Sequence, residues 1–204
     1  MVFAQNIQEI DSLSQVMCRE LEKTNPNDLP QERLGDVFEK VIVPYVEMQP
    51  IKIQGQVMEL FYFRSQRVCG LYLDLLSEAL DSPTPMKRVK EEPVSTISQQ
   101  DLDIFKQNKR FWYRENDGTK TKVTLSGGNW KSNYSDGTKS LYSLHWISSN
   151  RFEVAYIKSN NHRSKMNLVG DKYQYKILSR NGSEFTLCEW VEGMNKYSIF
   201  TLNL

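Results

Sequence analysis

The sequence predicts an α+β protein, in which an N-terminal three-helix segment precedes a C-terminal antiparallel β-meander. Two observations lead to this class. Up to about residue 80, apolar residues recur at three- and four-residue steps, which is the period of a helix. From Lys109 onwards they alternate with polar residues, and Asp-Gly and Asn-Gly turn signals separate the alternating runs. We therefore expect a helical bundle over residues 1–81, a linker over 82–98 and a β-domain over 99–204.

Three amphipathic helices fit the first part of the chain. The first carries one apolar stripe, formed by Ile7, Ile10, Leu13, Met17 and Leu21. The second begins after Asp28, a plausible N-cap, and Pro44 should kink it or end it early because proline lacks an amide donor. The third is expected over residues 54–80. Short connections between the three make a small antiparallel bundle the simplest packing.

The segment after the helices reads as a linker, because residues 82–96 contain three prolines and alternating blocks of charge. A short helix is then expected over residues 99–107. About eight strands follow, in the regions 109–115, 119–125, 128–134, 139–148, 152–158, 172–179, 183–191 and 195–203. Open edges would expose unpaired backbone groups, so we expect closure into a barrel or half-barrel.

One hairpin allows a prediction of strand register. A three-residue loop over residues 149–151 places Trp146 opposite Val154 and Leu144 opposite Tyr156. A two-residue loop would instead place Trp146 opposite an acidic residue and turn the apolar set to the wrong face. We therefore expect the three-residue loop.

Charge divides the chain as the hydrophobic pattern does. Residues 1–86 hold 7 basic and 13 acidic residues, whereas residues 87–204 hold 19 and 12. The two parts could dock on each other or meet different partners, and independent solvation is the simplest interpretation. No stretch resembles the about 20 apolar residues that span a bilayer.

The first six residues resemble the end of a bacterial export signal, without its basic start and apolar run. Either a signal precedes Met1 or the likeness is chance; we expect export to the periplasm or cell envelope, with the cytoplasm as the alternative. In an exported protein, a disulfide between Cys18 and Cys69 would stabilise the helices by ~4 kcal/mol through loop closure. The alternative is two buried thiols. Cys188 is expected to be unpaired.

Signatures of catalysis and of metal binding are missing from the sequence. The 2 His, His145 and His162, lack the spacing of metal ligands, so no metal or other cofactor is expected. No hydrolase elbow, phosphate loop or dinucleotide fingerprint occurs, and we expect no enzymatic activity. Acidic residues of the strands, Glu189 among them, are expected to point outward. Nucleic acid is not expected as a partner, because acids interrupt the basic residues and no known motif occurs.

Aromatic hairpin motifs give the β-domain a resemblance to known proteins. These motifs include Phe111-Trp112-Tyr113, Leu144-His145-Trp146-Ile147 and Tyr173-Gln174-Tyr175. Through them, residues 100–204 resemble the lipocalin-like (calycin-type) β-domain of uncharacterised exported bacterial proteins. The resemblance implies a calycin-type barrel or half-barrel and no particular reaction.

Two functions fit these expectations. In the first, aromatic residues line a cavity that holds a small apolar ligand; they are Trp130, Tyr142, Trp146, Tyr156, Tyr173 and Tyr175. This hypothesis requires an enclosed apolar cavity of roughly 300 Å³ or more. In the second, the same side chains fill the interior, and the protein acts through its surface as an interaction or structural protein of the cell envelope. The sequence does not give the oligomeric state.

Overall fold

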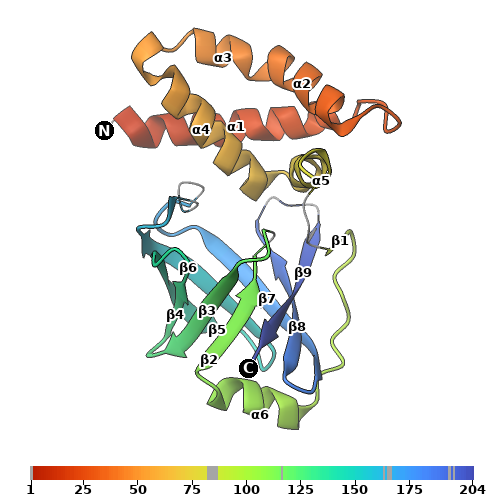
Figure 1. The fold of residues 1–204 in the computed structure, drawn as a ribbon, viewed down its shortest axis with the longest axis vertical. Helices are drawn as coiled ribbons and strands as arrows, with labels where there is room; N and C mark the ends of the chain where they lie inside the picture. Colours follow the sequence, from red (N-terminus) through yellow and green to blue (C-terminus); the bar gives the residue numbers. More distant parts are fainter. Residues whose placement is uncertain are drawn as a thin grey trace. The chain divides into compact units, whose positions relative to one another are not determined.

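The computed structural model describes residues 2–81, 87–115, 117–162, 164, 167–192, 194 and 196–204, with side chains from Ile7 onwards. The chain divides into two compact units, Met1–Ser82 and Pro83–Leu204. The first unit is helical, and the second holds the β-sheet and one further helix (Figure 1). The protein is therefore α+β, as the sequence predicts.

The described part of the helical unit contains five helices. They are α1 (Val2–Leu21), α2 (Pro30–Val41), α3 (Val43–Glu47), α4 (Ile51–Val68) and α5 (Gly70–Ala79). The apolar stripe predicted for the first helix is confirmed, because Ile10, Met17 and Leu21 are buried in one core with Phe61 of α4. A buried Arg64 in α4 also pairs with Asp11 of α1. The unit is thus held by one apolar core and by a charged contact between α1 and α4.

The second predicted helix ends early, as Pro44 predicts. Pro44 lies in the first turn of α3, where its missing amide breaks the ladder that would have continued α2. The predicted N-cap is wrong: Leu29 occupies that position, and the Asp28 carboxylate accepts a hydrogen bond from the Asn25 side chain.

The predicted third helix is in fact two helices. The backbone of Cys69 is extended (φ −130°, ψ 99°) and separates α4 from α5. Its sulfur accepts a hydrogen bond from the Tyr72 amide and so caps α5. Apolar periodicity continues across this break, because both helices face the same core, and this is why the sequence suggested one helix.

The second unit contains nine strands among its described residues. They are β1 (Lys87–Val89), β2 (Arg110–Arg114), β3 (Lys120–Ser126), β4 (Asn129–Asn133), β5 (Lys139–Trp146), β6 (Arg151–Ser159), β7 (Lys172–Asn181), β8 (Glu184–Trp190) and β9 (Tyr197–Asn203). Strands β2 to β9 confirm the eight predicted regions, and each pairs antiparallel with the next. Strand β9 also pairs with β2, where Trp112 lies opposite Asn203. The eight strands therefore form a closed ring (Figure 1).

The register predicted for one hairpin is wrong by two residues. Trp146 lies opposite Phe152, and Leu144 lies opposite Val154. The loop covers residues 147–150, and the amide of Ile147 donates to the carbonyl of Arg151. Because side chains alternate with a period of two, a shift of two residues keeps the same set on the inner face.

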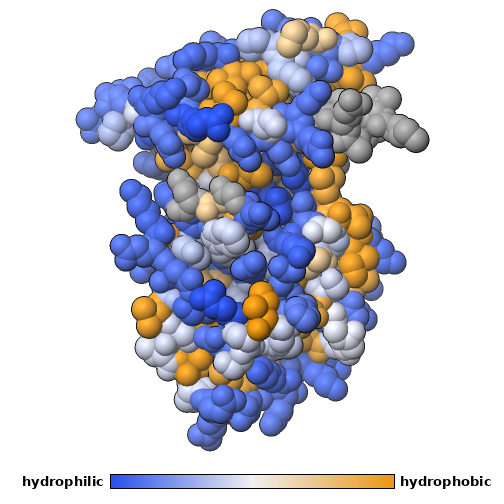
Figure 2. All heavy atoms as spheres, turned by 180° about the vertical axis from the view of Figure 1, so that it is seen from behind, coloured by the Kyte–Doolittle hydropathy of each residue, from blue (hydrophilic) through white to orange (hydrophobic). Residues whose placement is uncertain are grey.

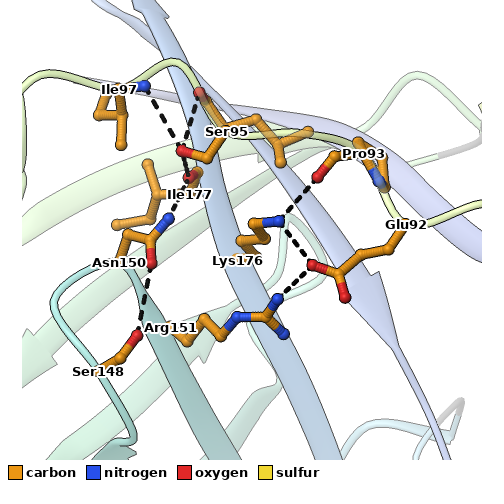
Figure 3. Close-up of polar contacts among 10 residues, drawn as sticks. Glu92, Pro93, Ser95, Ile97, Ser148, Asn150, Arg151, Lys176 and Ile177 are labelled. Carbon is orange, nitrogen blue, oxygen red and sulfur yellow. Dashed lines mark hydrogen bonds and ion pairs between the residues drawn. The ribbon is translucent and has the colours of Figure 1, made fainter.

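The expected linker takes part in the sheet. Residues 82–86 lie outside the described residues, but Lys87–Val89 form β1, which pairs with the edge of β9 beside its contact with β2. Residues 92–97 then run along β7 (Figure 3). Glu92 accepts a hydrogen bond from Lys176 (2.6 Å) and pairs with Arg151, and the Thr96 amide donates to the Leu178 carbonyl (2.7 Å). The charges that disfavoured regular structure in isolation thus find partners on the strands.

A short helix, α6 (Gln99–Gln107), lies across one end of the ring (Figure 1) and confirms the predicted helix over 99–107. The hydroxyl of Ser98 caps it by accepting from the Asp101 amide (3.1 Å). Its buried residues Leu102 and Phe105 join the core inside the ring. One end of the ring is therefore closed by a helix that the sequence itself predicts.

Candidate functional site

The inner face of the ring changes in character from one end to the other. Read away from α6, the inward residues are Phe111 and Tyr113 in β2, Phe152, Val154 and Tyr156 in β6, Ile177, Tyr175 and Tyr173 in β7, and Phe185, Leu187 and Glu189 in β8. Apolar side chains thus occupy the α6 end, which we call the packed end. Tyrosines, hydroxyls and carboxylates occupy the opposite end, which we call the tyrosine end.

The packed end is filled by aromatic rings in direct contact. The ring centroid of Phe105 lies 4.8 Å from that of Phe111 and 5.1 Å from that of Phe185. Trp146 packs 5.1 Å from Phe152, and the ammonium of Lys106 lies 4.6 Å from its ring centre. Such contacts leave the packed end as a conventional aromatic core.

The tyrosine end contains a cavity of about 220 Å³. Its lining includes five tyrosines, two other aromatic residues and two glutamates: Tyr113, Tyr134, Tyr142, Tyr173, Tyr175, Trp130, Phe200, Glu115 and Glu189. The cavity is smaller and more polar than the apolar cavity of roughly 300 Å³ that the ligand hypothesis required. It still exceeds the roughly 150 Å³ that holds benzene in an engineered protein core. Its size therefore suits a single ring with one or two substituents.

Four of the six aromatic residues selected from the sequence line this cavity. They are Trp130, Tyr142, Tyr173 and Tyr175. The other two lie elsewhere in the ring. Trp146 belongs to the packed end, and Tyr156 is buried against Tyr142, with ring centroids 5.6 Å apart. The structure thus separates the aromatic set into a lining and a supporting layer.

Sequence reasoning missed other parts of the lining. Glu189 was expected to point outward, but it has the same strand parity as the buried Phe185 and Leu187 and lines the cavity. Tyr113 has the parity of the buried Phe111 in the same way. Alternation along single strands could have identified both residues. Tyr134 and Glu115 follow strand ends, where alternation no longer applies, and only the structure places them.

Buried hydroxyls organise the side chains around the cavity. The indole of Trp130 donates to Ser132 (3.0 Å). Ser140 contacts the hydroxyl of Tyr134 (3.0 Å) and donates to Ser159 (2.8 Å). These hydrogen bonds fix the positions of the side chains around the cavity, so the lining keeps its shape without a ligand.

Tyr175 has a special position in this lining. Its ring stacks on Trp130 and on Phe152, with centroids 5.4 Å and 5.1 Å apart, so it lies between the packed end and the cavity. Among the described residues, its hydroxyl has no hydrogen-bond partner. The hydroxyl is therefore a donor and acceptor that water or a ligand in the cavity can satisfy.

Burial controls the ionisation of the lining. Desolvation raises the pKa of Tyr175 well above its usual value of 10.0, and the charge of Glu189 adds to this effect. The pKa values of Tyr113 and Tyr142 are raised in the same way, for Tyr113 with a contribution from Glu115. All three phenols are therefore neutral at physiological pH. They can offer hydrogen bonds but no negative charge.

The two glutamates bring negative charge to the same end. Glu115 accepts a hydrogen bond from Thr121 (2.6 Å) and interacts with Tyr113. Glu189 lies close enough to Tyr175 to affect its pKa. Arg114 also lines the cavity. The site therefore combines aromatic faces, neutral hydroxyls, carboxylates and one guanidinium, which suits binding and orientation of a small polar molecule.

Comparison with known proteins adds no family to this picture. No family model, curated protein or solved structure matches the chain. The lipocalin-like resemblance therefore rests on the aromatic motifs of the sequence alone.

The helical unit carries a separate chemical feature. Cys18 of α1 and Cys69 are joined by a disulfide, with Cα atoms 5.6 Å apart and a sequence separation of 51 residues. Cys188 is free and buried, and burial raises the pKa of its thiol. The disulfide is consistent with an oxidising compartment.

Among the described residues, no group of three or more His, Cys, Asp and Glu side chains could hold a metal ion. None of the helices in the same part of the chain is both long and apolar enough to cross a membrane.

Proposed function

We propose that the β-ring is a non-enzymatic binding module of lipocalin-like, barrel type that holds a small molecule at its tyrosine end. The observation that carries the proposal is the cavity of about 220 Å³ beside the hydroxyl of Tyr175, which forms no hydrogen bond with a described residue. A core that served only stability would be expected to fill this volume, since cavities cost stability. The polarity of the lining argues for a ligand that carries at least one hydroxyl or amino group on a single ring.

The proposal is tested by calorimetric titration of the full chain with three single-ring probes. Phenol is neutral, tyramine is cationic and 4-hydroxybenzoate is anionic at pH 7. We expect saturable binding of at least one probe, and the order of the three gives the charge that the site prefers. Binding of none of them in the millimolar range would contradict the proposal.

A matched pair of variants locates the binding. Val154→Phe places a larger side chain against the cavity and should abolish the titration signal, because Val154 is part of the lining. Ser143→Phe adds the same side chain at an exposed position of the adjacent strand β5 and should leave binding unchanged. Equal binding by both variants would show that the probes bind elsewhere.

We further propose that the protein works in an exported compartment, the periplasm or the cell envelope. The disulfide between Cys18 and Cys69 supports this, because reducing compartments disfavour such bonds. Alkylation of the protein in its own cells, before lysis, followed by mass spectrometry, should leave Cys18 and Cys69 unmodified until a reductant is added. Free thiols at both positions would contradict export.

The alternative function, an interaction or structural role in the envelope, needs a defined surface. The large exposed hydrophobic residues belong to several elements and include Met48 after α3, Ile51 at the start of α4, Val94 and Ile147. Figure 2 shows hydrophobic residues in separate groups on the face that it draws. These groups do not select one apolar docking surface, so the cavity supports the first function better.

A further inference from the structure

The outer face of β2–β5 carries a concentration of positive charge. These four strands contain no acidic residue and six basic ones, Arg110, Arg114, Lys120, Lys122, Lys131 and Lys139. All six are exposed, and by strand alternation they lie on the side opposite to the buried residues. We call these six residues the basic face.

Cross-strand pairing places these charges close together. Arg114 lies directly opposite Lys120, and Lys122 opposite Trp112. Asn133 pairs with Lys122 on one side and with Lys139 on the other. Thr124 pairs in the same way with Arg110 and with Lys131. Like charges directly opposite each other destabilise a sheet. The basic face therefore reduces the stability of the ring unless an anionic partner covers it.

On the remaining outer face of the ring, cations of β6 and β7 form ion pairs. On β6 and β7, Arg151 and Lys176 share Glu92, and Lys172 pairs with Glu153 (3.0 Å). No residue of the basic face forms an ion pair with a described residue. Three cations of β6 and β7 are thus paired with carboxylates, whereas the cations of the basic face are not paired with any described residue.

Trp112 lies among the residues of the basic face, and two of the six cations pack against its indole ring. The ammonium of Lys120 is 3.8 Å from the indole ring centre, and the guanidinium of Arg114 is 5.8 Å away. The indole nitrogen donates to the carbonyl of Leu204 (3.2 Å). A shallow depression of about 360 Å³ beside Trp112 is lined by Arg110 and Lys122 among others. Several cations of this depression can therefore contact one anionic group together.

We propose that the basic face binds a membrane surface rich in anionic phosphate headgroups. Each Lys or Arg near such a surface contributes about 1 kcal/mol, and tryptophan favours the interfacial region. Single-stranded nucleic acid fits less well, because it requires open aromatic platforms for its bases. Trp112, the only Phe, Tyr or Trp on the outer face of these four strands, already has the Lys120 ammonium against its ring. The proposal is independent of the ligand in the cavity.

The test is cosedimentation of the full chain with lipid vesicles. Vesicles of 30% phosphatidylglycerol in phosphatidylcholine should bind the protein at low salt and release it in 0.5 M NaCl, whereas pure phosphatidylcholine should not bind it. The variant Lys120→Gln/Lys122→Gln/Lys131→Gln should weaken partitioning about 100-fold, at about 1 kcal/mol for each cation. No binding to anionic vesicles would overturn the proposal.

A control variant tests whether weaker binding comes from loss of the basic face or from a change in net charge. Arg19→Gln/Lys52→Gln/Lys90→Gln removes three positive charges from exposed positions outside the basic face that form no ion pair with a described residue, and this variant should bind as the unmodified protein does. Equal losses in both variants would overturn the proposal, because they would show an effect of net charge alone. Binding of a 20-nucleotide single-stranded DNA without binding of vesicles would also overturn it and assign the face to nucleic acid. Thermal unfolding should show that neither triple variant is destabilised.

Discussion

The two ends of the ring share strands and closure but differ in what fills them. At the packed end, α6 delivers Phe105 into a cluster of phenylalanines. At the tyrosine end, the same strands carry phenols in place of phenyl rings and leave about 220 Å³ unfilled. Closure of the ring fixes an interior volume, and the choice of side chains decides whether this volume becomes core or site.

The largest expected effect is the loss of an aromatic ring at the packed end. Phe152→Ala should lower the free energy of unfolding by about 3–5 kcal/mol, because Phe152 is fully buried among aromatic neighbours. Tyr173→Ala at the tyrosine end should cost less than about 2 kcal/mol, because part of its ring already faces the cavity. Urea denaturation measures both, and equal costs would remove the distinction between the ends.

Enlarging two inward valines should have effects of different size on stability. Val123, 1% exposed, contacts the packed core, and Val123→Phe should destabilise the fold by about 1–3 kcal/mol through overpacking. Val154, 2% exposed, borders the cavity, and Val154→Phe should change stability by less than about 1 kcal/mol because the cavity accepts the added ring. Thermal unfolding of the two variants decides this, and similar losses would mean that the cavity is not open.

The segment that leads into α6 should support the packed end from outside. Hydrogen bonding by Lys176, with the charge of Arg151, lowers the pKa of Glu92 below its usual 4.5. A lowered pKa in the folded state stabilises the protein above the unfolded pKa, and this contribution is lost as the pH falls through the folded value. Glu92→Gln should therefore cost about 1–2 kcal/mol at pH 7.

The pH dependence of the Glu92 variant supplies the control. The difference in unfolding free energy between Glu92→Gln and the unmodified protein should shrink as the pH falls below about 4.5, where the glutamate becomes protonated. Urea denaturation from pH 7 to pH 3 measures this difference. A difference that is constant over this range would show that the ion pairs drawn in Figure 3 do not stabilise the segment.

The smallest expected effect distinguishes two kinds of hydroxyl at the tyrosine end. Tyr175→Phe should change stability by less than about 0.5 kcal/mol, because its hydroxyl bonds to no described residue. Ser140→Ala should cost about 1–2 kcal/mol, since it removes the partner of Tyr134 and Ser159. In the probe titrations, by contrast, Tyr175→Phe should weaken binding at least tenfold. A large loss of stability in Tyr175→Phe would show that its hydroxyl has a structural partner.

Local patterns in the sequence predict most of the elements but not their closure. Alternation and turn residues predict β2 to β9, and an N-cap serine with an apolar stripe accompanies α6. The break at Cys69 and the strand β1 depend on partners far away in the sequence, namely Cys18 and β9. Such contacts leave no periodic signal, so the helix over 54–80 and the unstructured linker were the natural but incorrect expectations.

The candidate site was predictable where strand parity decides it. Trp130, Tyr142, Tyr173 and Tyr175 stand at inward positions, and the structure brings them together. Trp146 has an inward position too, but it lies at the α6 end, and parity does not tell how far along the ring a residue lies. The volume of the cavity and its carboxylates depend on packing between strands that no single strand reveals.

A crystal structure of the protein soaked in phenol shows whether the tyrosine end holds a ligand. We expect one phenol ring inside the tyrosine end, with its hydroxyl within hydrogen-bond distance of Tyr175 Oη and the packed end unchanged. Tyrosine side chains that turn inward and fill the cavity, with no phenol bound there at saturating concentration, would contradict this expectation.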